Sequence, residues 1–250
     1  MDLTAFPKAL RITAVLAALV LLAWAGVALA MALCSGFSQA SLLAGVKAVP
    51  KLAADLFAPK ENSFRGLPNI AATSVLRRGF GHGVSASDGR MLYDLLVKRG
   101  YRRVLDVGTA RGYAALWFGM AMRETGGKVI TIEIDPAVAQ RARENIRQAG
   151  LENVIESRIN DALIEVPATR GDFDFVFLDL GGPHHRELLD LLSPRLTRGG
   201  AIVSHNAYLL RFTGDDYLAT VCNKADMETR ILPTLSGGIA VSVKRSSSAP

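Results

Sequence analysis

The stretch that decides the fold is RVLDVGTARGY, residues 103–113. Apolar residues dominate positions 104–107, two glycines bracket a short turn, and an apolar segment with helical spacing follows. This order predicts a buried strand, a tight turn, and a helix whose N-terminus opens on that turn. A second predicted strand, residues 128–132, is followed by Glu133. In a parallel sheet this carboxylate lies beside the first turn, where it can accept hydrogen bonds from both hydroxyls of a ribose. The sequence therefore predicts a nucleoside-binding site.

The spacing of the glycines separates two kinds of nucleoside site. Dinucleotide sites use G-x-G-x-x-G, because a pyrophosphate must lie against bare backbone at the helix N-terminus. Here Asp106 precedes the turn, and three residues separate Gly108 from Gly112. An acid at this position disfavours a pyrophosphate but suits a ligand that carries an ammonium and a sulfonium group. The pattern therefore argues against a dinucleotide.

This turn resembles the first motif of class I S-adenosylmethionine-dependent methyltransferases, and five further motifs make small O-methyltransferases of the catechol and caffeoyl-coenzyme A type the closest resemblance. These motifs are GVSASDGRML (83–92), TIEID (131–135), NDAL (160–163), DFDFVFLD (172–179) and RGGAIVSHN (198–206). The resemblance implies S-adenosylmethionine as cofactor, with segment 83–92 over its methionine end. The cofactor-binding residues that it implies are Val84, Asp106, Gly108, Thr109, Gly112, Tyr113, Glu133, Asp161, Ala162 and Asp179.

The metal site is where the sequence departs from that family. The resemblance implies a divalent metal held by two aspartates and an asparagine, which are oxygen ligands suited to magnesium. Asp179 and Asn206 are in place, whereas His205 stands where the second aspartate is expected. Imidazole favours zinc and other transition metals. The candidate ligands are therefore Asp179, His205 and Asn206, and we expect activity that is independent of magnesium or better supported by a transition metal.

The proton acceptor is a second departure. The family commonly has a lysine a few residues beyond the aspartate, but residues 180–185 read LGGPHH. Either a histidine removes the proton, since neutral imidazole is the natural base near neutral pH, or the substrate needs no metal-assisted deprotonation. The catalytic candidates are His184, His185 and Asp179. For the two histidines, the first turn of a solvated helix is an equally supported interpretation.

Residues 81–245 read as one methyltransferase domain. Strand-like runs alternate with amphipathic stretches at 91–97, 114–122, 137–149 and 187–192, which predicts an α/β fold with a doubly wound, mostly parallel Rossmann-like sheet. A helix at 215–225 and strands at 229–232 and 238–244 are expected to follow. The resemblance implies that these strands close a seven-stranded sheet as an antiparallel pair. Residues 246–250 are expected to be a disordered tail.

The N-terminus carries an uncharged, almost wholly apolar run at residues 12–33. As a helix it is about 33 Å long, enough to cross a bilayer. We expect a single-pass membrane anchor between a short flank, residues 1–11, and a basic connector, residues 34–80. A cleavable signal peptide is the alternative, because residues 28–30 offer a small-x-small cleavage site. Since S-adenosylmethionine is made in the cytoplasm, we expect an uncleaved anchor and a cytoplasmic catalytic domain.

Composition limits the other partners. The net charge is +6, but basic and acidic residues are interleaved and no aromatic–basic platform is present, so no nucleic-acid partner is expected. Cys34 and Cys222 argue against a disulfide framework. Oligomerisation stays open. The leading function is O-methylation of a small hydroxylated, phenolic or apolar substrate at a membrane. The alternatives are an N- or lipid-headgroup methyltransferase and a non-catalytic nucleoside-binding relative.

Overall fold

The structure is a computed structural model that describes residues 63–78, 83–212, 215–234 and 236–245. Within these ranges no helix combines the length and apolarity needed to cross a membrane. The predicted anchor at residues 12–33, most of the predicted connector and the tail at 246–250 lie outside the described residues.

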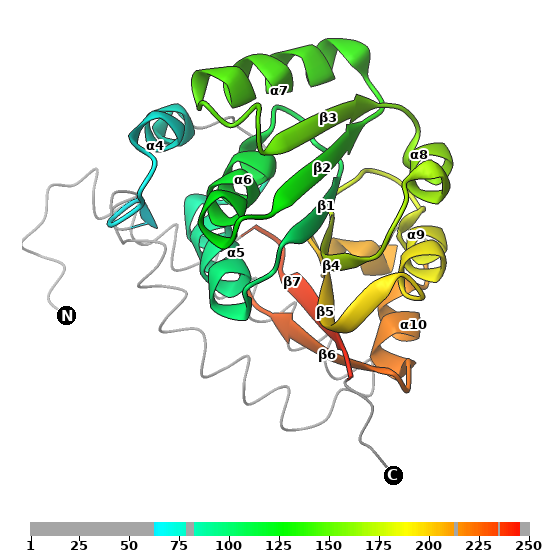
Figure 1. Ribbon diagram of the computed structural model, residues 1–250. Coiled ribbons are helices and arrows are strands. Elements are labelled where there is room, and N and C mark those ends of the chain that lie inside the picture. The colour runs from blue at the N-terminus through cyan, green and yellow to red at the C-terminus, as the bar shows by residue number, and fades with distance from the viewer. Residues whose placement is uncertain (1–62, 79–82, 213–214, 235, 246–250) are drawn as a thin grey trace, which may run out of the picture. The chain divides into compact units, whose positions relative to one another are not determined.

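A seven-stranded sheet forms the centre of the described domain, in the order β3-β2-β1-β4-β5-β7-β6 (Figure 1). Among the first five strands in this order, β3, β2, β1, β4 and β5, neighbours pair in parallel. Strand β7 is antiparallel to both β5 and β6. The predicted doubly wound sheet with a closing antiparallel pair is therefore confirmed. The strands are β1 (Arg103–Val107), β2 (Lys128–Glu133), β3 (Ile155–Ile159), β4 (Phe173–Leu178), β5 (Leu196–Ser204), β6 (Met227–Leu232) and β7 (Ile239–Lys244).

Helices cover both faces of the sheet (Figure 1). One layer contains α4 (Ile70–Arg77), α5 (Ala86–Arg99), α6 (Tyr113–Thr125) and α7 (Pro136–Gln148). The other contains α8 (Ala162–Ala168), α9 (His185–Leu192) and α10 (Tyr217–Asn223), and a short 3₁₀ helix, η2 (Leu209–Phe212), follows β5. Because both faces of the sheet are buried, β1 carries apolar residues on each face: Val104 joins the core under α6, and Leu105 joins the core under α9.

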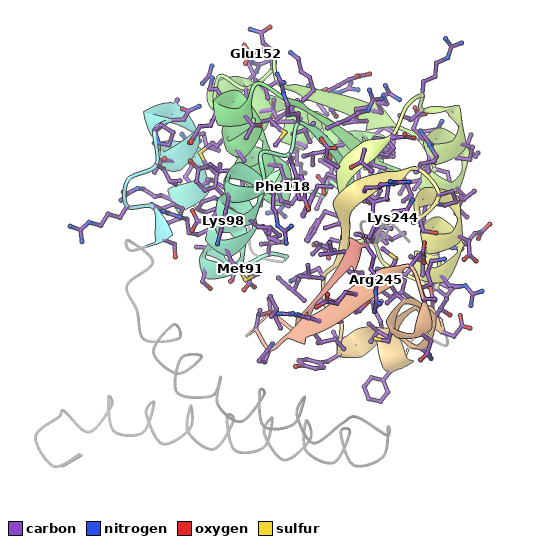
Figure 2. All side chains as sticks on the ribbon, turned by 60° about the horizontal axis from the view of Figure 1, so that its bottom comes forward. Met91, Lys98, Phe118, Glu152, Lys244 and Arg245 are labelled. Carbon is purple, nitrogen blue, oxygen red and sulfur yellow. The ribbon has the colours of Figure 1, made fainter. Side chains whose placement is uncertain are left out.

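Helix α6 is buried on all sides along residues 114–122, since α5 covers the side that faces away from the sheet. The expectation of an amphipathic helix at residues 114–122 was therefore wrong, because a helix that is buried on all sides is apolar all round. Phe118 lies between α6 and the sheet (Figure 2). Its ring centroid is 5.5 Å from that of Phe175 and 5.2 Å from that of Phe177, both on β4.

Part of the segment predicted as connector packs against the domain. The ring of Phe64 stacks on Trp117 of α6 with centroids 5.7 Å apart. Arg90 of α5 donates a hydrogen bond of 2.7 Å to the carbonyl of Arg65. Helix α4 begins after Asn69, whose side chain accepts a hydrogen bond from the third residue beyond it. The domain therefore includes residues 63–78.

The topology fixes where a ligand can bind. From β1 the sheet continues to β2 and β3 on one side, and to β4 and β5 on the other. Ligands of such sheets bind beyond the carboxyl ends of the strands where the order reverses. Here that point lies between β1 and β4, where the backbone N–H of Asp179 donates to the carbonyl of Val107 at 2.9 Å.

Candidate active site

The turn between β1 and α6 is held by backbone hydrogen bonds. The N–H groups of Gly108 and Thr109 both donate to the carbonyl of Ile132, at 3.0 and 3.1 Å. Gly108 has φ +98°, and a Cβ there would stand 2.2 Å from the carbonyl oxygen of Asp179. Only glycine allows this approach of β1 and β4. The turn thus leads the chain into α6, whose N-terminus carries N–H donors and a partial positive charge.

Glu133 lies beside this turn, as the sequence predicts. Its Oε2 accepts a hydrogen bond of 2.8 Å from the N–H of Ala110, and its Oε1 accepts one of 3.1 Å from the N–H of Asp135. Ala110 has φ +46°, a left-handed conformation that is strained for a residue with a Cβ. The carboxylate therefore connects the end of β2 to the middle of the turn.

Asp106 is fully buried behind the turn. Its Oδ2 accepts a hydrogen bond of 2.6 Å from Thr131, whose hydroxyl also lies 2.5 Å from that of Thr109. Its Oδ1 has no hydrogen-bond partner among the described residues. Burial raises the pKa of Asp106 to about 8, so the carboxyl favours its protonated form. The Asp106 side chain lies in the core and has no exposed surface in this structure. Direct contact between Asp106 and a cofactor therefore stays a prediction.

A hollow of about 220 Å³ opens in front of the turn. Five of the predicted cofactor residues line it: Val84, Gly108, Thr109, Tyr113 and Asp179. The sequence did not single out Ala110, Arg111 or Val138, which also line it. Ala110 and Arg111 lie between the two motif glycines, Gly108 and Gly112, and this position in the turn could have predicted that they line the site. Val138 lies on α7 and carries no motif.

The end of β3 brings the next two predicted residues close to Glu133. Asn160 donates its backbone N–H to the carbonyl of Glu133 at 3.1 Å, and Asp161 and Ala162 follow directly. The Asp161 carboxylate caps α8 by accepting the N–H of Leu163 at 2.8 Å. Ile134 is 66% exposed at this edge, although it is a large apolar residue. Such a side chain offers a flat apolar ligand a contact, and although Ile134 belongs to the TIEID motif it was not among the expected cofactor-binding residues.

The ends of β4 and β5 bring together Asp179 and His205. Nδ1 of His205 lies 2.9 Å from Oδ1 of Asp179. The imidazole is buried, and its Nε2 has no hydrogen-bond partner among the described residues. Asp179 Oδ2 points toward Gly83, because a Cβ on that glycine would stand 4.0 Å from it. The histidine thus fixes one oxygen of the carboxylate and leaves the other at the hollow.

These residues do not fit a magnesium ion. The set contains one carboxylate, one of whose oxygens is occupied by the imidazole, and magnesium prefers oxygen ligands in octahedral geometry. Asn206 has φ +53° and its Oδ1 lies against Gly237. No cluster of three or more His, Cys, Asp or Glu side chains suited to a metal occurs among the described residues. Support by a transition metal stays a prediction.

The two histidines after β4 have different environments. His184 is exposed, with Nδ1 3.9 Å from a carboxylate oxygen of Glu187. His185 is buried against Tyr217, and burial lowers the pKa of its imidazole. His184 can therefore meet a solvent-borne molecule, whereas His185 cannot do so in this conformation. The catalytic role of either histidine stays a prediction.

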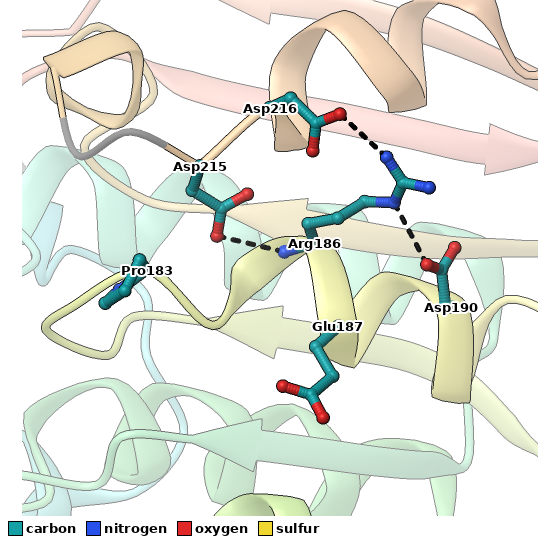
Figure 3. A pocket seen from close by; sticks show the side chains of 6 residues that line it. All are labelled: Pro183, Arg186, Glu187, Asp190, Asp215 and Asp216. Atoms are coloured by element: carbon teal, nitrogen blue, oxygen red, sulfur yellow. Dashed lines mark hydrogen bonds and ion pairs between the residues drawn. The ribbon is translucent and has the colours of Figure 1, made fainter.

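A second hollow, of about 340 Å³, lies between α9 and α10 (Figure 3). One cation there already bonds two of the lining carboxylates: Arg186 reaches Asp190 at 3.0 Å and Asp216 at 2.9 Å. None of the predicted cofactor residues lines it. These contacts join two helices, so we assign this hollow a structural role.

Comparison with known proteins agrees with this geometry. Residues 105–207 match the model of a family described as "Methyltransferase domain". Catechol O-methyltransferase of Niastella koreensis is 32% identical over 140 residues, which are 54% of this chain and 62% of that protein. A protein of Mycobacterium sp. (strain JLS) named "Putative O-methyltransferase" is 31% identical over 170 residues, which are 66% of this chain and 76% of that protein.

A solved structure shows the same fold. The O-methyltransferase from Bacillus cereus in complex with SAH superposes with a TM-score of 0.62 at 23% identity, covering 79% of this chain and 97% of that one. Among the curated relatives, the match covers 62% of the Niastella protein and 54% of the catechol O-methyltransferase of Mycobacterium tuberculosis. The chain thus spans somewhat more than half the length of these two catechol enzymes.

Proposed function

The chain belongs to the O-methyltransferase family, as its motifs indicated, and we propose that it transfers the methyl group of S-adenosylmethionine to a hydroxyl oxygen of a small molecule. The observation that carries the proposal is the hydrogen bond of 2.8 Å from the backbone N–H of Ala110, in the β1–α6 turn, to Oε2 of Glu133. The turn borders a hollow of about 220 Å³. The ribose hydroxyls would bond Glu133. The methionine end would lie toward Val84 and the N-terminus of α6, whose partial positive charge suits a carboxylate.

S-adenosylmethionine, when bound, supplies an electrophilic methyl group on a sulfonium. The protein's part is to hold the acceptor oxygen in line with that methyl and to remove a proton. Asp179 is the candidate proton acceptor at the hollow, because His205 holds its Oδ1 at 2.9 Å while Oδ2 points toward Gly83. His184 is the second candidate, because it is exposed on the loop that follows Asp179.

Catechols and other phenols are the first acceptors to test, since two curated relatives are named as catechol O-methyltransferases. Purified full chain would be incubated with labelled S-adenosylmethionine and catechols, simple phenols, amines or phospholipids, with chelator or with added metal. We expect methylated phenol, retained when magnesium is chelated. Methylation of amines or lipids alone would instead support one of the alternative substrate classes. Cofactor binding without transfer to any acceptor would favour a non-catalytic relative.

We also propose that residues 12–33 anchor the protein in a membrane with the catalytic domain on the cytoplasmic side. The length of the apolar run supports the anchor, and the cytoplasmic supply of the methyl donor supports the orientation. N-terminal sequencing of the cellular protein is expected to find the run intact. A mature N-terminus at Met31 or later would show cleavage, and a cysteine placed at Lys60 should react only with membrane-permeant reagents.

A further inference from the structure

We propose that Ser236, in the turn between β6 and β7, is a positioning residue that holds the wall of the cofactor site closed. The wall concerned is the covering segment, residues 83–92, which includes two residues that line the hollow. This inference rests on the proposed function, because it assigns Ser236 to retention of S-adenosylmethionine and its demethylated product. Ser236 lies far along the chain from every motif that marks the cofactor site.

The first observation is a contact between Ser236 and the covering segment. The Ser236 hydroxyl donates a hydrogen bond to Oδ2 of Asp88, which is 4% exposed in the first turn of α5. Among the described residues, no other side chain donates to this carboxylate. The backbone N–H of Asp88 in turn donates to the hydroxyl of Ser85, the N-cap of α5, at 3.1 Å. Ser85 directly follows Gly83 and Val84, which line the hollow.

The second observation is that the other side of the same turn is fastened to the end of β5. The carbonyl oxygens of Gly237 and Gly238 accept the backbone N–H groups of Tyr208 and Ala207, each at 3.0 Å. Gly237 has φ +99°, and a Cβ there would stand 2.7 Å from Oδ1 of Asn206. The turn between β6 and β7 is therefore fixed to the segment that follows β5, on the side of the site where Asp179 and His205 lie.

Together these contacts bridge the two walls of the hollow. The covering segment supplies Gly83 and Val84 to the lining, and Asp179, which follows β4, also lines the hollow and is bonded to His205, which follows β5. Ser236 reaches across from the β5 side, and its hydroxyl lies 3.0 Å from that of Thr234. Because Gly83 and Val84 line the hollow, a movement of this segment would change how closely the hollow holds a ligand. Without the Ser236 hydroxyl, the Asp88 carboxylate is buried without a side-chain donor, which favours conformations that let water reach it.

The test compares serine variants of the same hairpin in the full chain. Ser236→Ala is expected to weaken S-adenosylhomocysteine affinity about tenfold in calorimetry, the scale of losing a hydrogen bond to a charged group. The loss should come from faster dissociation. The KM for S-adenosylmethionine should rise more than the KM for the acceptor. Ser236→Thr keeps the hydroxyl and is expected to restore affinity, which a purely steric role would not predict.

Ser242→Ala is the matched control. Ser242 lies on β7 of the same hairpin, and its hydroxyl is 3.0 Å from that of Thr229, so this variant also loses one side-chain hydrogen bond. We expect its affinity for S-adenosylhomocysteine to stay within twofold of wild type at a similar loss of thermal stability. If Ser236→Ala proves unfolded, Asp88→Asn tests the same contact, because it keeps an acceptor oxygen without the charge and should weaken binding severalfold.

Two results would overturn the inference alone. One is wild-type affinity in Ser236→Ala and Asp88→Asn, and the other is an equal loss of affinity in Ser242→Ala. A wild-type protein that binds neither S-adenosylmethionine nor S-adenosylhomocysteine would overturn the proposed function and this inference with it.

Discussion

The two halves of the sheet differ in how closely they follow the family pattern. On one side, β1, β2 and β3 carry the glycine turn, Glu133 and Asp161, and the structure gathers these residues around one edge. On the other side, β4 and β5 are followed by Asp179 and His205, which bond each other where the family resemblance implies two aspartates on a metal. The cofactor half follows the pattern, and the acceptor half departs from it.

This difference has a physical reason. The cofactor is one molecule, with fixed hydroxyl, carboxylate and ammonium positions, so the residues that bind it have few alternatives. The acceptor and its proton can be handled in several ways, by a metal, a lysine, a histidine or a carboxylate. Variants in the first half should therefore change cofactor binding, while variants in the second half should change metal response and acceptor choice.

The largest effect is expected from Gly108→Ala. A Cβ 2.2 Å from the carbonyl oxygen of Asp179, at φ +98°, forces β1 and β4 apart. We expect a loss of about 4–5 kcal/mol in the free energy of unfolding and no detectable cofactor binding. Chemical denaturation and calorimetry measure both. Gly150→Ala is the control, because Gly150 also has positive φ but nothing lies within 4 Å of its Cβ position, so it should cost only about 1 kcal/mol.

Asp106→Asn tests whether the buried acid of the cofactor half is neutral. Its pKa of about 8 lies above the unfolded value, so the folded protein keeps a proton that the unfolded chain loses from about pH 4 upward. Wild type therefore loses stability between about pH 4 and pH 8, and the variant should not. We expect the variant to be more stable by roughly 2–4 kcal/mol at pH 8 and equal below pH 4. Parallel curves from denaturation across this range would contradict the raised pKa.

Glu133→Ala measures the ribose contact. We expect affinity for S-adenosylhomocysteine to fall by about 1.5–3 kcal/mol, the scale of hydrogen bonds to a charged group. Glu133→Gln should lose less, because one oxygen can still accept the N–H of Ala110. Glu144→Ala, an exposed glutamate on α7, is the control for charge alone. Tight NAD binding in calorimetry, without response to S-adenosylmethionine, would instead place a dinucleotide in this half.

His205→Asp asks whether the acceptor half can be returned to the family's ligand set. A second carboxylate beside Asp179 adds repulsion that a divalent cation relieves. We expect magnesium to raise the rate of this variant about fivefold, on the order of 1 kcal/mol, and to leave wild type unchanged. Rate measurements with chelator and with magnesium decide this. If wild-type activity vanishes with chelator and returns fully with magnesium alone, the histidine is a tolerated ligand or a bystander, and the contrast between the two halves loses its chemical basis.

The smallest effect is expected from Ala110→Gly. The left-handed φ of +46° is easier for glycine, and the hydrogen bond from residue 110 to Glu133 does not need a side chain. We expect a gain of about 0.5–1 kcal/mol in stability with cofactor affinity unchanged. Ala137→Gly, in the first turn of α7, should lose a similar amount, because its backbone is helical. A loss in both variants would mean that the turn of the cofactor half is not strained.

The sequence alone determined the sheet and the cofactor edge. Strands, turns and helices leave local patterns, so residues 103–113 and the apolar segment after them predicted β1, the turn and α6 without knowledge of the rest. The parallel order placed Glu133 beside the turn, and the structure gives that contact at 2.8 Å. The limits of the domain were less readable, since residues 63–78 read as a basic connector but pack through Phe64 and α4.

Only the tertiary structure decided which side chains meet across long stretches of chain. No local pattern says that Asp106 is buried, that His205 bonds Asp179 rather than facing solvent, or that Ser236 reaches Asp88 across 148 positions of sequence. These facts depend on which strand edges and loops are neighbours, and on how much water is left around each polar atom. Periodicity fixes the face on which a residue lies, whereas packing between distant segments fixes its partner, its burial and its pKa.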